Sequence, residues 1–265
     1  MTPIGSNVPE EAFMLCEACG YILTGLPADS RCPECGQPIA KSSPDLRQLP
    51  AWERDDAALP DGQRFWSTTA AVIFHPARFY RTLATRSDRA KSRAFARRHW
   101  ILVTLLFGWT GSLQLLWMFG ITTWVGTPDW AKWLYSLTRP GPMRSGLLLV
   151  ILGFAPCCAL TYGTLLLATR LAARLTAWEA RLRNLRLPHS VILRGLDYHA
   201  PHYLPVAVVT FLTVAGYQVL LVLGLADAIS GPRYLYVLSA EVFISAAYLF
   251  KTYWTAMRNM MFANR

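Results

Sequence analysis

Long apolar runs dominate the pattern of this chain. Residues 99–128 contain no Lys, Arg, Asp or Glu, and residues 145–169 are equally free of charge. Two further apolar runs begin near Tyr203 and Tyr234, and only a short segment at 227–233 joins them. Apolar runs of about 20 residues are typical of helices that cross a bilayer. The pattern therefore predicts four transmembrane helices, at about 99–125, 145–169, 203–226 and 234–251.

Two other segments have an amphipathic pattern. Residues 65–83 combine aromatic side chains with arginines and are interrupted by Pro76, which favours a segment lying in the membrane interface rather than a full span. Residues 170–187 repeat Leu and Trp at helical spacing with arginines between them, which predicts a helix that leaves the membrane and bends onto its surface. Residues 41–63 are rich in proline and charge without an apolar period, and are interpreted as a linker.

The charge is divided unevenly along the chain. The formal net charge is +10, but residues 1–63 carry 4 Lys/Arg against 10 Asp/Glu, and the remaining residues carry 22 against 6. Apolar residues make up 53% of the chain, which is too many for an ordinary soluble domain. Because the basic residues lie where membrane topology would put them, the charge does not indicate binding to nucleic acid.

Basic residues also predict the orientation of the spans. With both termini inside, 17 Lys/Arg of the flanking segments face the cytoplasm and 4 face the exterior. Cytoplasmic loops carry the excess of Lys and Arg, so this orientation is preferred. The N-terminus has neither a basic segment nor an apolar core of the kind that secretory signals have, so we expect the first domain to stay in the cytoplasm.

Four cysteines form two pairs of the type C-x-x-C-G, separated by 12 residues. Each pair brings two sulfur atoms together, and the glycine that follows permits the left-handed backbone that closes the turn. Four thiolates complete the tetrahedral shell of a structural Zn²⁺ ion. The predicted ligands are Cys16, Cys19, Cys32 and Cys35. The pattern resembles zinc ribbons; rubredoxins hold iron in similar turns, but the short gap and the single aromatic residue nearby, Tyr21, favour zinc.

A few polar residues inside the apolar runs are further candidates. Glu241 lies within the fourth predicted span, where a carboxylate is costly and indicates either a functional site or a group satisfied by hydrogen bonds. Gln114 and Gln218 on other spans are its candidate neighbours. Asp197, His199 and His202 form a weaker candidate for a metal or proton site, and the preferred interpretation of this stretch is a loop entering the third span.

The motif P-x-R-F-Y-R-T-L at 76–83, followed by a basic stretch and spaced apolar spans, resembles the Ypt-interacting-protein (Yip) family. Bacterial relatives of that family are sometimes fused to N-terminal zinc ribbons. The resemblance covers roughly residues 64–260. It implies a membrane scaffold without enzymatic activity, with a role in membrane organisation or trafficking, located in the bacterial inner membrane.

Together these features predict an all-α polytopic membrane bundle of four helices with a small N-terminal zinc ribbon. The expected divisions are a ribbon at 1–40, a linker at 41–63, an interfacial and basic segment at 64–98, and a membrane domain at 99–260. We expect a non-enzymatic scaffold that contacts lipid and docks a protein partner through the ribbon. The alternatives are a small transporter or intramembrane enzyme that uses Glu241, and an electron carrier with iron in the ribbon.

Overall fold

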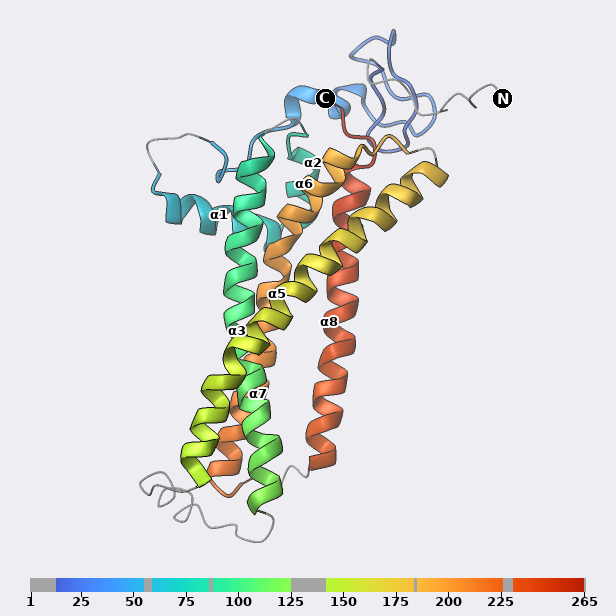
Figure 1. The fold of residues 1–265 in the computed structure, drawn as a ribbon. Helices are drawn as coiled ribbons and strands as arrows, with labels where there is room; N and C mark the ends of the chain where they lie inside the picture. Colours follow the sequence, from blue (N-terminus) through green and yellow to red (C-terminus); the bar gives the residue numbers. More distant parts are fainter. Residues whose placement is uncertain are drawn as a thin grey trace, which may run out of the picture. The chain divides into compact units, whose positions relative to one another are not determined.

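The computed structural model describes residues 13–54, 59–85, 88–124, 142–183, 185–225 and 231–264. Within these ranges the chain is helical and has no strand, only three isolated β-bridges. Three short 3-10 helices, η1 (Ile39–Ser42), η2 (Pro44–Leu46) and η3 (Ala200–His202), accompany the α-helices drawn in Figure 1. The α-helices are α1 (Asp61–Phe74), α2 (Pro76–Thr82), α3 (Arg89–Trp124), α5 (Pro142–Leu182), α6 (His189–His199), α7 (Tyr203–Val222) and α8 (Gly231–Met260).

The chain divides into two compact units. Unit 1 contains Met1–Arg98, Ala168–His202 and Phe250–Arg265, and unit 2 contains His99–Leu167 and Tyr203–Leu249. Three long helices, α3, α5 and α8, each contribute residues to both units.

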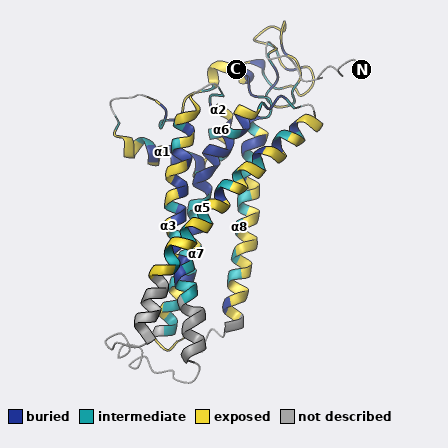
Figure 2. Ribbon diagram, viewed as in Figure 1, coloured by how far each residue is buried: buried dark blue, intermediate teal, exposed yellow. Residues whose placement is uncertain are grey.

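Three described segments are long and apolar enough to cross a membrane: Ile151–Leu182, His189–Leu221 and Arg233–Met260. They overlap the second, third and fourth predicted spans, with bounds that differ by up to 14 residues. In the segments Ile151–Leu182 and Arg233–Met260, only 6% of the most apolar 18-residue window is buried by protein. Figure 2 shows exposed residues along much of α5 and α8, the helices that contain these segments. Leu160 and Phe243 are 73% and 76% exposed. So much uncovered apolar surface is suited to lipid rather than to water.

The first predicted span, at 99–125, falls on α3. This helix continues to Trp124, but the side chains beyond Leu115 and the segment 125–141 lie outside the described residues. A fourth transmembrane helix therefore stays a prediction.

The predicted second span and the predicted surface helix after it form one continuous helix. α5 runs from Pro142 to Leu182 and contains Pro156, with no break where the arginines begin at Arg170. The expectation of a separate, bent helix over 170–187 is not met. Leu171, Leu175 and Leu182 recur at helical spacing after Arg170, so the sequence favours helix on both sides of the change in polarity.

The stretch around Asp197, His199 and His202, expected to be a loop, is also helical. It forms the end of α6 and the short helix η3, directly before α7. Pro201 lies within η3 and Pro205 is the third residue of α7, so both occupy positions near a helix start. A proline is tolerated there because the first N–H groups of a helix have no partner within it.

Aromatic side chains form the centre of unit 1. Ring centroids lie 5.3 Å apart for Phe65 and Phe95 and 5.1 Å apart for Phe95 and Tyr198. The predicted interfacial segment contributes to this core as two helices, α1 and α2, which are separated at His75. Trp66 is 53% exposed, whereas Tyr80 is fully buried. The tyrosine therefore stabilises a protein core rather than lying at headgroup level.

Small residues allow close packing of α3 and α5 in unit 2. A Cβ atom on Gly111 would lie 2.7 Å from the Cys157 sulfur, and one on Gly108 would collide with the Cys158 sulfur. These glycines thus leave room for two cysteine side chains, a pattern common where membrane helices pack. Cys157 and Cys158 are free thiols that act as small packing groups.

A buried ion pair joins the segment interpreted as a linker to α6 in unit 1. Both Arg194 terminal nitrogens donate to the Glu53 carboxylate, at 2.7 and 2.9 Å, and the Tyr198 hydroxyl donates to the same carboxylate. The Arg194 and Glu53 side chains are only 4% and 1% exposed. Arg194 also donates to the backbone oxygen of Ala84 at 2.7 Å. Glu53 itself, within the segment interpreted as a linker, is therefore part of folded unit 1.

We predict that Glu53→Ala strongly destabilises the protein. The substitution leaves the Arg194 guanidinium buried without its counter-ion, which costs about 3–5 kcal/mol. The measurement is denaturant unfolding of the purified protein in detergent. Asp61→Asn is the matched control, because it removes a carboxylate paired with Arg64 that is 67% exposed, and the expected cost is about 0–1 kcal/mol. Equal effects of the two substitutions would contradict a structural role for the buried pair.

Candidate metal centre

The two C-x-x-C turns fold in the same way. The Gly20 N–H donates to the Cys16 oxygen at 2.8 Å, and the Gly36 N–H donates to the Cys32 oxygen at 2.9 Å. Both glycines have a positive φ, +81° and +71°, which a residue with a side chain adopts only with strain. Isolated bridges close the turns, one from Leu15 to Ile22 and one from Arg31 to Pro38. The repeated geometry orients both pairs of sulfur atoms toward one point.

The four sulfur atoms of Cys16, Cys19, Cys32 and Cys35 all lie within 4.8 Å of one another. The Cys16 and Cys35 sulfurs are 3.5 Å apart, and those of Cys19 and Cys32 are 3.6 Å apart. A tetrahedral Zn²⁺ ion with bonds of about 2.3 Å places its sulfur ligands about 3.8 Å apart. The donor set therefore fits one metal ion, and its four ligands leave no coordination position open.

Among the four thiols, the environment favours the thiolate form of Cys32 most. Burial alone would raise the pKa of Cys32, but the backbone N–H groups of Cys35 and Glu34 stabilise its thiolate and lower the pKa to about 7. Burial, together with its sulfur neighbours, raises the pKa of Cys19 to about 12. Neighbouring thiols compete for negative charge, so a bound cation would displace the remaining protons.

The C-terminal tail binds the first cysteine turn. The Asn264 side chain accepts a hydrogen bond from the Leu15 N–H at 2.8 Å and donates to the oxygens of Leu15 and Ser42, each at 2.7 Å. Its own N–H donates to the Glu17 carboxylate at 3.0 Å. Asn264 is 3% exposed, so this amide holds the tail against the ribbon in a buried site.

Two arginines support the same contact. Arg186, which is 6% exposed, donates to the oxygens of Phe13 and Ala263 and to the Asn264 side chain. Arg47 donates to the Glu17 carboxylate at 2.8 Å and to the Leu83 oxygen at 2.9 Å. The sequence pattern gave no sign of these contacts, because the tail residue and the ribbon residue it binds are 249 positions apart.

Asp197, His199 and His202, the weaker candidates for a metal or proton site, are held by hydrogen bonds and ring contacts in unit 1. A metal site needs at least three His, Cys, Asp or Glu side chains whose ligand atoms lie close together. Among the described residues, the four cysteines form such a group. Asp197 accepts a hydrogen bond from the Ser92 hydroxyl at 3.0 Å, and His199 shares one with the Thr252 hydroxyl at 3.0 Å. The His199 and His202 rings have centroids 5.0 Å apart. All three residues are buried within unit 1, where these contacts indicate a structural role.

The candidate polar site around Glu241 is only partly assembled in unit 2. Gln114 accepts a hydrogen bond from the Tyr234 hydroxyl at 2.9 Å, and Gln218 donates to the Leu113 oxygen at 3.2 Å. Both carboxylate oxygens of Glu241 are buried and have no hydrogen-bond partner among the described residues. The two glutamines thus bind other groups, and a transport or catalytic role for Glu241 stays a prediction.

Comparison of the chain with protein-family models, with curated protein sequences and with solved structures found no match. The resemblance to the Yip family is therefore neither supported nor contradicted by a relative. What the structure establishes is coarser: a helical chain with membrane-length segments and a four-cysteine cluster able to hold a metal ion.

We predict that the purified protein holds one metal ion per chain and that Cys16→Ser or Cys32→Ser abolishes its retention. Both side chains are buried in the cluster, and a three-sulfur set loses one bond and its closed shell. The measurement is elemental analysis of protein purified in detergent. Cys157→Ser, in α5, is the control and should keep the metal. Retention of a full equivalent by the Cys16 or Cys32 variant would show that the cluster is not the binding site.

Proposed function

We propose that this chain is an integral membrane scaffold that docks a protein partner through a zinc ribbon. The proposal is supported by two features of the ribbon, taken together. Asn264 of the C-terminal tail is hydrogen-bonded to Leu15 at one edge of the ribbon. Three apolar side chains elsewhere on the ribbon are exposed. The proposal includes no enzymatic step.

Zinc is the metal that suits this site best. The ligands are four thiolates in a closed set, which is the arrangement of structural zinc sites. Iron in a rubredoxin-like centre would make the chain an electron carrier, and it would give the purified protein a visible thiolate-to-iron absorption band. A colourless protein that contains zinc supports the structural role.

The exposed residues Tyr21, Ile22 and Leu26 supply the docking surface. They are 43%, 44% and 37% exposed, and they belong to the ribbon, whose described core is the small cluster of Cys16, Leu23, Cys32 and Ile39 with Met14 and Cys19 packed against it. Aromatic and aliphatic side chains of this kind form the central contacts of protein interfaces. Because the ribbon is tied to the tail that follows α8, a partner bound there would be held close to the membrane.

The expected partner carries a basic surface beside an apolar one. The first 63 residues have 4 Lys/Arg against 10 Asp/Glu, and Asp29 and Glu34 are exposed on the ribbon. We call these two exposed carboxylates the acidic rim. The acidic rim attracts a positively charged partner and disfavours a negatively charged one. In this proposal both termini lie in the cytoplasm of a bacterial cell, where the thiols stay reduced, and four helices cross the inner membrane, as the Yip-like layout implies.

We predict that Ile22→Asp weakens binding of the partner by at least about tenfold, since it places a charge in the centre of the apolar contact. The partner is first captured on the full-length protein in detergent, then purified, and its dissociation constant is measured for each variant. Leu46→Asp is the matched control, because Leu46 is 49% exposed but lies outside the ribbon, on η2.

Two results would count against the docking surface. Equal affinity of the Ile22→Asp and Leu46→Asp variants would place the contact elsewhere. Binding that does not weaken between low and high salt would contradict the role of the acidic rim, since exposed charge contacts are screened. Metal content is measured for both variants, so that loss of the ribbon fold is distinguished from loss of the surface.

A further inference from the structure

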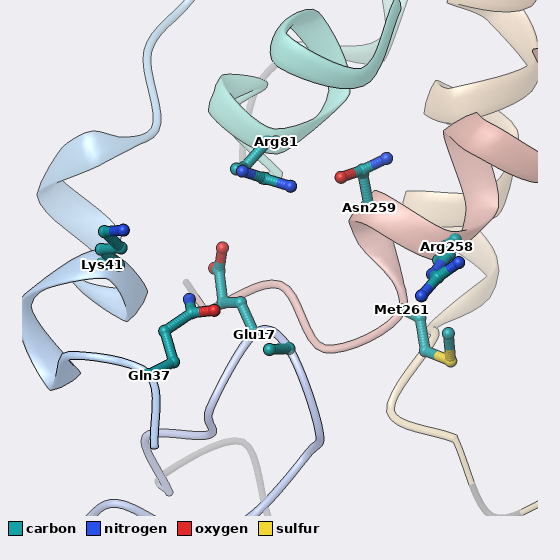
Figure 3. A pocket seen from close by; sticks show the side chains of 8 residues that line it. Glu17, Gln37, Lys41, Arg81, Arg258, Asn259 and Met261 are labelled. Carbon is teal, nitrogen blue, oxygen red and sulfur yellow. The ribbon is translucent and has the colours of Figure 1, made fainter. Parts of the chain in front are cut away.

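A pocket of about 170 Å³ opens beside the ribbon in unit 1 (Figure 3). Its lining comes from the ribbon, from η1, from α2 and from the end of α8 with the tail that follows. Three of the lining residues are cations on three different elements: Lys41 on η1, Arg81 on α2 and Arg258 on α8. We call this feature the basic pocket.

The single carboxylate of the basic pocket is already bound to other groups. Glu17 accepts hydrogen bonds from the Arg47 guanidinium at 2.8 Å and from the Asn264 N–H at 3.0 Å. Lys41, Arg81 and Arg258 are exposed, and in the described part of the chain none of them forms an ion pair. The pocket therefore gathers positive charge that no carboxylate of the described residues neutralises by an ion pair.

Helix ends account for only part of this charge. Arg81 and Arg258 lie in the last turns of α2 and α8, where a cation complements the partial negative charge of unpaired carbonyls. Each helix end carries at most about half a negative charge. Because Glu17 is paired with Arg47, these two half-charges offset only one of the three lining cations, and a surplus of about two positive charges remains.

The position of the pocket at the end of α8 points to a membrane lipid as the source of its ligand. α8 contains a membrane-length segment, Arg233–Met260, and Arg258 is close to its end, so in a membrane this residue and the tail would lie near the surface. Anionic lipid headgroups are concentrated at that level. At about 30 Å³ per water, the pocket has room for roughly five waters, which is enough for one phosphate group. Arginine is well suited to bind phosphate oxygens in pairs.

We propose that the basic pocket binds the phosphate of an anionic lipid headgroup through Lys41, Arg81 and Arg258. This site is separate from the docking surface of the ribbon. Lipid bound there would contact the ribbon, η1, α2 and the end of α8 together, and would hold the ribbon at the membrane surface.

The test uses the full-length protein in a neutral detergent and follows its thermal unfolding. The probes are short-chain phosphatidylglycerol, short-chain phosphatidylcholine and inorganic phosphate. Phosphatidylglycerol should raise the melting temperature, and its apparent affinity should fall by at least about tenfold in the triple variant Lys41→Gln, Arg81→Gln, Arg258→Gln. The single variant Arg81→Gln should lose about fivefold.

A charge-matched control separates the pocket from general surface charge. Arg97→Gln, Arg170→Gln and Arg174→Gln remove three exposed arginines that do not line the pocket. This variant should keep the effect of phosphatidylglycerol. An equal loss in both triple variants, or equal protection by phosphatidylcholine, would overturn the proposal. Protection by inorganic phosphate without any effect of lipid would overturn lipid as the source. An unchanged metal content in both variants shows that the ribbon is intact.

Discussion

The convergence of four cysteine sulfurs within 4.8 Å is the constraint on which the N-terminal part of the molecule depends. In the described residues the apolar core of the ribbon is small: Leu23 and Ile39 lie beside two of the cysteines, and the partly buried Met14 and Cys19 pack against them. A core so small cannot offset the entropy lost on folding. A structural Zn²⁺ ion held by the four thiolates would supply about 10–16 kcal/mol and would then be the main source of stability for the ribbon.

The closed ribbon in turn positions the groups that bind the other end of the chain. The first cysteine turn fixes the backbone of Leu15 and the carboxylate of Glu17, and Asn264 binds both. Phe262 packs on Gly20, where any side chain would lie within 2.8 Å of its ring. The C-terminal tail therefore has a binding site only when the turn is formed. This contact couples the metal centre to the end of a membrane-length helix.

Local patterns in the sequence predicted the features that depend on local spacing. The apolar runs located α5, α7 and α8 because a membrane span needs a continuous apolar surface, and the spacing of Cys16, Cys19, Cys32 and Cys35 located the cluster. Contacts between distant residues were not predictable. Glu53 lies in a stretch rich in proline and charge, and its partner Arg194 is 141 positions away. Asn264 has no neighbouring residue that marks it, since its role depends on where the chain ends meet in space.

Hydrogen exchange of backbone amides, measured with and without metal, tests the coupling most directly. The account predicts that chelation of the metal increases exchange in peptides from the ribbon, residues 13–40, and also in the tail, residues 260–264. Exchange in α6 should stay unchanged, because its contacts with Glu53 do not involve the ribbon. If chelation exposed the ribbon and left the protection of the tail unaltered, the metal centre would not control docking of the C-terminus.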